Sequence, residues 1–405
     1  MSILQTELNL DMVRAEFPAL ASGYAFLDNA GGSQTLGRVA DRVRDYLLST
    51  NVQLGASYTV SVAATERVSV ASRAVAAYVN AADPKEIVLG SSTTQLIGNL
   101  ALALQDEFTA GDEIVITTAD HEANVGAWRR LEKRGLVIKT WNVDRDSLLL
   151  EAKDLDAIMT KRTRLVAFAH VSNVLGSLHD VRGLTRAIHE RGARVLVDGV
   201  AFAPHREIDV RAWDVDYYVF SFYKVYGPHI AMLYGKRELL EAASGINHSF
   251  ITEVPYKLQP GNVNYELAHS LGGVFEYVDA LGAASSAGKR GAFEDIAAHE
   301  EALGERLLSW LRGKKGVSII GEASSDRTRR VPTIAFRFHG VTPEAVVRRV
   351  DESRIGIRHG DFYSKGLVGQ LGLQASGGVV RASMVHYNTV AEVDRLITAL
   401  DAATS

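Results

Sequence analysis

The most informative stretch of the sequence is Tyr217-Tyr-Val-Phe-Ser-Phe-Tyr-Lys-Val-Tyr-Gly-Pro228. It predicts a short apolar strand followed by a Ser/Tyr/Gly-rich turn that contains Lys224. Upstream, a second apolar strand, Arg194-Val-Leu-Val-Asp198, ends on an aspartate. In mostly parallel sheets the ligand lies outside the carboxyl ends of the strands. We therefore expect Lys224 and Asp198 at that edge, although spacing alone also allows an internal salt bridge or two residues that never meet.

The first two thirds of the chain alternate short β-branched runs with segments of helical periodicity. Strands that are buried on both faces and separated by helices predict a three-layer α/β sandwich with a mostly parallel central sheet. Helical periodicity is clear at 123–134 and 181–191. The candidate strands are 86–90, 113–117, 136–141, 164–169, 194–198, 217–220 and 230–234.

The pattern changes after the polar turn Gln259-Pro-Gly-Asn-Val-Asn264. Long helical stretches follow, and then strands and helices alternate in a way that predicts a smaller α+β C-terminal domain. We expect three parts: an N-terminal segment, 1–23, that packs with the small domain; a large ligand-binding domain, 24–264; and a connecting helix with the small domain, 265–405. The expected elements are helices at 265–283, 293–311, from 342 and at 390–402, and strands at 316–320, 333–338 and 379–383.

Composition narrows the class of protein. The 405 residues are 47% hydrophobic and carry a net charge of −4, so neither nucleic acid nor a membrane is an expected partner. The sequence contains no cysteine, which excludes disulfides, thiolate metal sites and a cysteine nucleophile. The N-terminus lacks the pattern of a signal peptide. We expect a cytoplasmic protein.

The pair Lys224 and Asp198 suits one cofactor, pyridoxal phosphate. A buried amine can form a Schiff base with it, and a buried carboxylate can keep its pyridine nitrogen protonated. The segment Gly90-Ser-Ser-Thr-Thr-Gln95 joins a strand to a helix at 96–104, where hydroxyls and free N–H groups suit a phosphate. An ordinary Ser/Thr N-cap is the alternative interpretation of that segment.

Two further polar clusters follow predicted strands. In Asp120-His-Glu-Ala-Asn124, His121 could stack on a ligand ring or could be a hydrogen-bonded loop residue. Val125 stands where a metalloprotease helix needs its second histidine, so we expect no metal site there. In His170-Val-Ser-Asn-Val-Leu-Gly176, Asn173 could bind a ligand or merely satisfy the turn.

Taken together, these clusters resemble the class V aminotransferases of pyridoxal-phosphate fold type I, and within them the branch that contains cysteine desulfurases and selenocysteine lyases. The resemblance covers nearly the whole chain. It is carried by Phe26-Leu-Asp-Asn-Ala-Gly-Gly32, Asp120-His-Glu-Ala-Asn124, His170-Val-Ser-Asn173, Val197-Asp-Gly199, Tyr218-Val-Phe-Ser-Phe-Tyr-Lys-Val-Tyr-Gly-Pro228 and Val380-Arg-Ala-Ser-Met-Val-His-Tyr-Asn-Thr389.

The resemblance implies a role for each matching residue around the cofactor. Lys224 would be the Schiff-base lysine and proton shuttle, and Asp198 would pair with the pyridine nitrogen. His121 would stack over the ring as the third catalytic residue, and Asn173 would reach the ring hydroxyl. The phosphate would be held by Thr93, Thr94 and Ser221.

The remaining roles concern the substrate and a second subunit. Arg381 would bind the substrate carboxylate bidentately, a task that its planar fork suits, and Asn29 would also contact the substrate. Asn262 would reach the phosphate bound by the partner subunit, which implies a homodimer with shared active sites.

Three departures from the family pattern bear on function. Desulfurases of this branch carry a cysteine on a mobile loop, whereas the matching stretch here, Arg358-His-Gly-Asp-Phe-Tyr-Ser364, has Tyr363 at or near that place. Ala201 stands where the family usually has glutamine. Tyr223, before the lysine, stands where many relatives have histidine; it could donate to the phosphate or only pack.

The frame without the cysteine predicts an enzyme that acts on a small amino acid. We expect a Cβ–S or other Cβ–X lyase that uses a cysteine-like substrate and forms no persulfide on the protein. The alternatives are a class V aminotransferase or an amino-acid epimerase, and, from another class, a non-catalytic binding protein that kept the fold.

Overall fold

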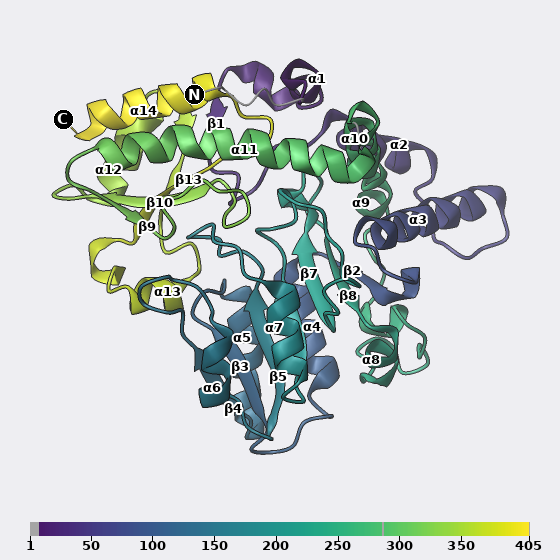
Figure 1. Cartoon of the computed structure of the whole chain (residues 1–405). Helices are drawn as coiled ribbons and strands as arrows, with labels where there is room; N and C mark the ends of the chain where they lie inside the picture. Colours follow the sequence, from purple (N-terminus) through teal and green to yellow (C-terminus); the bar gives the residue numbers. More distant parts are fainter. Residues whose placement is uncertain (1–7, 286, 405) are drawn as a thin grey trace.

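The computed structural model describes residues 8–285 and 287–404, and a seven-stranded sheet forms the centre of its larger part (Figure 1). The strand order is β2-β8-β7-β6-β5-β3-β4. β8 runs antiparallel to both of its neighbours, and the other ladders are parallel. The strands are β2 (Ile87–Gly90), β3 (Glu113–Thr117), β4 (Val137–Trp141), β5 (Thr163–Ala169), β6 (Arg194–Asp198), β7 (Tyr217–Ser221) and β8 (Ala231–Gly235).

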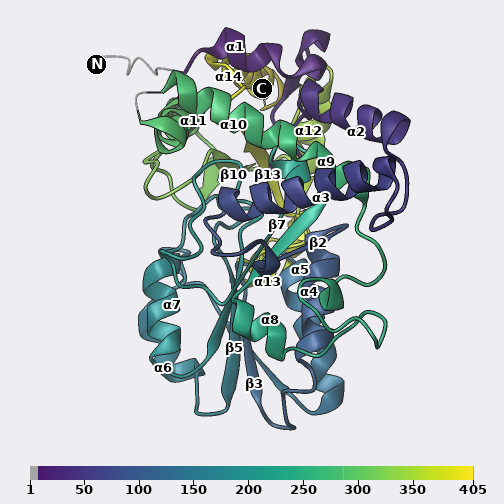
Figure 2. The ribbon, with the colours of Figure 1, turned by 90° about the vertical axis from the view of Figure 1, so that its right-hand side faces the viewer.

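Helices cover both faces of this sheet, which confirms the predicted α/β sandwich. Successive strand residues alternate between two apolar cores: Val115 belongs to one core, and Ile114 and Ile116 belong to the other. Figure 2 shows α7 on one side of the strands and α4 and α5 on the other. The covering helices are α3 (Thr59–Tyr78), α7 (Val181–His189) and α10 (Gly272–Ala284) on the first face and α4 (Thr93–Leu104) and α5 (Ala123–Arg129) on the second.

Some helices differ from the expectation. The predicted helix 123–134 is α helical only to Arg129 and continues as a 3₁₀ turn, Arg130–Arg134, before Gly135 in the left-handed region. The stretch 265–283 is divided into α9 (Tyr265–Ser270) and α10. Among the helices without a prediction are two long ones, α2 (Gly37–Ser49) and α3. The exposed face of α3 carries Val60, Val62 and Val70, which blurs its helical period.

The C-terminal part contains the smaller α+β unit. Its antiparallel sheet has the order β12-β13-β10-β9, and helices α11, α12 and α14 contribute to its apolar core. In Figure 1, α11 runs from the region of α10 to this unit. Its elements are α11 (Gly288–Gly313), β9 (Val317–Ile320), β10 (Thr333–Phe338), α12 (Pro343–Asp351), β12 (Arg358–Gly360), α13 (Lys365–Gln370), β13 (Val379–Ser383) and α14 (Val390–Thr404).

The N-terminal segment contacts both parts of the chain. Residues 1–7 of the predicted segment 1–23 lie outside the described residues, and the remainder contains α1 (Leu10–Ala15). Arg14 forms an ion pair of 3.1 Å with Glu392 of α14, and Phe17 packs its ring against Tyr226 of the large domain. None of the helices within 8–285 and 287–404 combines the length and apolar character needed to cross a membrane.

A buried charge cluster joins the long helix α11 to the loop that follows β6. Glu300 of α11 is 1% exposed, and its carboxylate lies 2.8 Å from Nδ1 of His205 and 2.8 Å from Nη1 of Arg206. A buried carboxylate of this kind is tolerated because both of its oxygens have partners.

Glu300→Ala should therefore lower the free energy of unfolding by about 3–5 kcal/mol, because it leaves the buried His205 ring and the half-buried Arg206 guanidinium without their carboxylate partner. Chemical denaturation would measure the loss. Glu241→Ala is the control: it removes an exposed pair with Arg237 and should cost less than about 1 kcal/mol. Equal losses in the two variants would contradict the structural role given to Glu300.

Candidate active site

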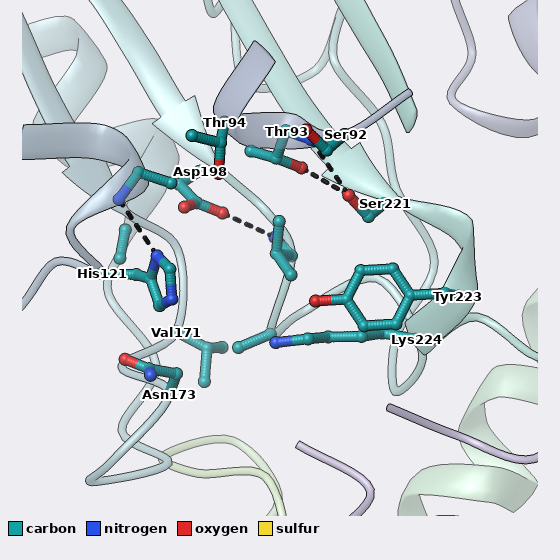
Figure 3. A pocket seen from close by; sticks show the side chains of 14 residues that line it. Ser92, Thr93, Thr94, His121, Val171, Asn173, Asp198, Ser221, Tyr223 and Lys224 are labelled. Carbon is teal, nitrogen blue, oxygen red and sulfur yellow. Dashed lines mark hydrogen bonds between the residues drawn. The ribbon is translucent and has the colours of Figure 1, made fainter. Parts of the chain in front are cut away.

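A cavity lies at the carboxyl ends of the central strands (Figure 3), where ligands bind in mostly parallel sheets. Each strand contributes through the segment that follows it: β2 leads to Thr93, β3 to His121, β5 to Asn173, β6 ends at Asp198 and β7 leads to Lys224. Residues far apart in the sequence therefore meet because β3, β5, β6 and β7 are parallel neighbours, and β2, beyond the antiparallel β8, runs in the same direction as they do.

Lys224 and Asp198 line this cavity, as the sequence predicted for the edge of the sheet. Both are buried, at 7% and 5% exposure. Burial, and then the charge of Arg381, lowers the pKa of the Lys224 amine below its ordinary value. Burial raises the pKa of Asp198, against the N–H of Val200, which donates to it at 2.9 Å, and the charge of Lys224. The charge of each group favours the charged form of the other, whereas the low dielectric around them favours the neutral forms.

The phosphate end of the site is the N-terminus of α4. Ser92 is the N-cap and accepts from the N–H of Gln95 at 3.1 Å. Thr93 begins the helix, and its hydroxyl lies 2.7 Å from that of Ser221. Thr94, which is exposed, also lines the cavity. Hydroxyls and the positive end of a 12-residue helix suit an anion such as a phosphate.

His121 lies on the opposite side of the cavity from Tyr223 in Figure 3. Its Nδ1 accepts from the N–H of Ala123 at 3.1 Å, which fixes the ring. Burial, and then the charges of Lys224 and Arg381, lower the pKa of His121 to about 4. The imidazole is therefore neutral near pH 7 and can stack on an aromatic ligand without adding charge.

These residues fit pyridoxal phosphate. The cavity offers an amine for its aldehyde, a carboxylate for its pyridine nitrogen, a neutral ring for its face and a helix N-terminus for its phosphate. Val171, Val200 and Ala201 add apolar lining. Ala201 has no polar side chain to offer a ligand at this part of the cavity.

A second hollow, of about 760 Å³, adjoins the first through His121, Asn173, Tyr223 and Lys224, which line both. Arg381 of β13 lines it and is 2% exposed. Its Nη2 donates to Asp28 at 2.7 Å, and its Nη1 donates to the carbonyl of Asn173 at 2.9 Å. Nε is buried and has no hydrogen-bond partner within the described residues. A fixed guanidinium with a spare donor suits a carboxylate.

Two predicted residues lie elsewhere. The amide of Asn29 donates to the carbonyls of Phe26 and Ser383, at 2.9 and 2.8 Å, and its oxygen accepts from the Tyr387 hydroxyl. Asn29 is thus engaged by the protein and lines neither hollow. Asn262 is exposed and bonds to Gln53 at 3.3 Å, away from the cavity of its own chain. Its predicted role at a partner's phosphate stays a prediction.

The structure also brings in residues that had no predicted role. Asp28 pairs with Arg381, the ring of Phe362 lies 3.9 Å from the Arg381 guanidinium, and Ser364 bonds to Asn173. Asp28 stands in the motif Phe26–Gly32, and the other two stand in the stretch 358–364. Their position in these motifs was the only indication in the sequence that they belong to the site. Their contact partners are distant in the sequence, so only the fold identifies those partners.

Comparisons with known proteins agree with this geometry. The family profile "Aminotransferase class-V" matches residues 25–396. The chain is 41% identical to the aminotransferase-like protein FGM3 of Gibberella zeae, over 98% of both chains. It is 33% identical to the cysteine desulfurase-like protein ustD of Aspergillus flavus, over 98% of this chain and 91% of that one. A crystal structure of the cysteine desulfurase CsdA from Escherichia coli superposes with a TM-score of 0.85, at 28% identity and 98% coverage of both chains.

Lys224→Ala should abolish the visible absorbance of the bound cofactor, because no other amine lines the cavity among the described residues. Absorption spectra of the purified variant after addition of pyridoxal phosphate would measure this. Lys236→Ala is the control, since Lys236 pairs with Asp214 and Asp216 outside the cavity. A variant at 224 that keeps the band of the wild type would contradict the assignment.

Proposed function

Because this chain belongs to the class V aminotransferase family, whose members depend on pyridoxal phosphate, we propose that it is a lyase that cleaves the Cβ–S or another Cβ–X bond of a cysteine-like amino acid without a persulfide on the protein. The observation that carries the proposal is the absence of cysteine from all 405 residues. Tyr363 stands at or near the place that the resemblance gives to the desulfurase cysteine, and without a cysteine in the sequence the departing sulfur has no protein thiol to receive it.

The side chains of the cavity support this chemistry. Bound pyridoxal phosphate supplies an electron sink for the charge that develops at Cα. Lys224 would hold the cofactor and then move the α-proton, a task that needs an uncharged amine and is favoured by its lowered pKa. Asp198 would keep the ring nitrogen protonated by ion pairing. His121, neutral and fixed by Ala123, would cover one face of the ring.

Arg381 is proposed to bind the substrate carboxylate. Its guanidinium is already held by Asp28 and by the carbonyl of Asn173, so little side-chain entropy remains to be lost on binding. Lys224 and Arg381 line the same hollow, which would place the α-carbon of a bound amino acid near the amine. Positioning of this kind is a large part of what such a site contributes.

With cysteine as substrate the reaction balances as elimination. The Cα–H and Cβ–S bonds break, the sulfur leaves as sulfide, and water then releases pyruvate and ammonia. Transamination is the second candidate function, because the relative FGM3 is named aminotransferase-like. Transamination would keep the Cβ–X bond and would leave the amino group of the substrate on the cofactor. Epimerisation would also keep that bond, and the α-proton would return to the opposite face of Cα.

We also propose that the enzyme is a homodimer with shared active sites. The exposed position of Asn262, outside the cavity of its own chain, supports a role in a partner subunit.

Purified enzyme loaded with cofactor should release pyruvate from at least one of cysteine, cystine, cysteine sulfinate or an S-conjugate. Coupled oxidation of NADH by lactate dehydrogenase would measure the pyruvate, and intact-mass analysis should find no added sulfur on the protein. Lys224→Ala is the control and should release none. Absence of pyruvate with every substrate would reject the lyase, and accumulation of the pyridoxamine form would favour transamination.

Arg381→Lys should lower kcat/KM about 10- to 100-fold through a higher KM, because lysine keeps the charge but loses the two-pronged donor. Steady-state kinetics with the substrate found above would measure this. Arg348→Lys, on the exposed side of α12, is the control and should leave both constants unchanged. A wild-type KM in Arg381→Lys would argue against a role in carboxylate binding.

A further inference from the structure

The hydroxyl of Ser364 is used in an unusual way. Ser364 stands at the N-cap position of α13, where a serine commonly accepts from a backbone N–H of the first turn. Here it makes no capping bond. It is fully buried, at 0% exposure, and its hydroxyl donates to Oδ1 of Asn173 at 2.7 Å. The hydroxyl of Ser364 therefore bonds to the side chain of Asn173, which lines the cavity, and not to a backbone N–H of α13.

The partner of this hydroxyl, Asn173, is fixed from three directions. Its Nδ2 donates to the carbonyl of Phe362 at 3.0 Å, its Oδ1 accepts from Ser364, and its backbone carbonyl accepts from Arg381. The Phe362 carbonyl can only accept, so it fixes which end of the amide is the nitrogen, and the Ser364 hydroxyl then donates to the oxygen at the other end. The amide nitrogen has two hydrogens, and the described residues use one of them.

The free hydrogen belongs to a side chain at the junction of the two hollows. Asn173 is 8% exposed and lines both. Figure 3 shows the Lys224 amine pointing toward the side of the cavity where Val171 and Asn173 lie. A buried donor of fixed orientation at this junction is suited to an oxygen of a bound cofactor.

The backbone that carries Ser364 is itself strained. Phe362 and Tyr363 have φ angles of 54° and 59°, in the left-handed region that residues other than glycine rarely adopt. Strain of this kind persists only where surrounding contacts hold it, and it is common at functional sites. The holding contacts are the bond from the N–H of Glu122 to the Tyr363 carbonyl, at 2.8 Å, and the two bonds to the Asn173 amide.

We propose that Ser364 is a positioning residue for the cofactor, acting through Asn173. It holds the Asn173 amide so that the remaining N–H would be available to the ring hydroxyl of pyridoxal phosphate, and it thereby couples the segment 361–364 to the cofactor site. The proposal rests on the role of Asn173 proposed above. It assigns to Ser364 a function that the sequence motifs did not suggest.

The proposal has a spectroscopic consequence. A hydrogen bond donated to the deprotonated ring oxygen stabilises that form and lowers the pH at which the bound cofactor titrates. Ser364→Ala removes one of the two bonds that orient the amide, so the midpoint of the visible band should rise. One hydrogen bond of ordinary strength corresponds to a rise of about half a pH unit or more.

The experiment is a pH titration of the absorbance of cofactor-loaded wild type, Ser364→Ala, Asn173→Ala and the double variant. Both single variants should show a raised midpoint, and the double variant should match Asn173→Ala because the serine acts through the asparagine. Ser364→Thr keeps the hydroxyl and should restore the wild-type value. Ser376→Ala is the control, because its hydroxyl bonds only to the Leu373 carbonyl, and its midpoint should be unchanged.

Amide hydrogen exchange of the loaded protein gives a second readout. Exchange across 361–364 should become several-fold faster in Ser364→Ala and remain unchanged in Ser376→Ala. If Ser364→Ala does not retain cofactor, Ser364→Gly makes the same deletion and is titrated in its place.

The outcomes separate the two proposals. A raised midpoint in Asn173→Ala with a wild-type midpoint in Ser364→Ala overturns the role of Ser364 and leaves that of Asn173 intact. Wild-type midpoints in both variants overturn both. A double variant shifted well beyond Asn173→Ala would show that Ser364 acts by another route, and would also overturn the proposal.

Discussion

The buried pair of Lys224 and Asp198 is the constraint around which the rest of the structure is arranged. An amine and a carboxylate cost several kcal/mol each to remove from water, and burial accordingly shifts the pKa of each group toward its neutral form, against the charge of the other. Adjacent parallel strands bring the two groups to the same place, because β6 and β7 end side by side at one edge of the sheet. The apolar cores on both faces hold these strands in register and so fix the distance between the two groups.

Around this pair, the two parts of the chain contribute different functions. The large sheet provides the phosphate end, the ring environment and the amine, all from segments that follow its strands. The small domain provides Arg381 and the segment 361–364, which reach the cavity because β12 and β13 pair next to it. Asn173 lies where the two meet: its side chain bonds to the segment and its backbone accepts from the arginine. This arrangement agrees with the fold and the pyridoxal phosphate cofactor of the class V aminotransferase family, to which the chain belongs.

The strands were the easiest part of the fold to predict from the sequence. Buried parallel strands are continuous apolar runs, so 113–117 and 194–198 were placed at their observed bounds. The helices were harder to predict. Exposed valines on α3 obscure its helical periodicity, and α5 continues as a 3₁₀ turn before Gly135. In the site, Thr93, His121, Asn173, Ser221 and Lys224 follow strands and could be anticipated for that reason. The place of Asn29 outside both hollows could not be anticipated, because its hydrogen bonds to Ser383 and Tyr387 join segments that are more than 350 positions apart.

Residue type and local periodicity were enough to predict the layered fold, the lysine and aspartate at the strand ends, and the absence of a thiol. Which groups meet depends on the three-dimensional packing of the chain. The ion pair of Arg381 with Asp28, the ring of Phe362 beneath the guanidinium and the diversion of Ser364 from its helix to Asn173 are contacts across long sequence separations. The packing of strands and loops in space determines these contacts, because the type of a side chain does not specify which distant residue will lie beside it.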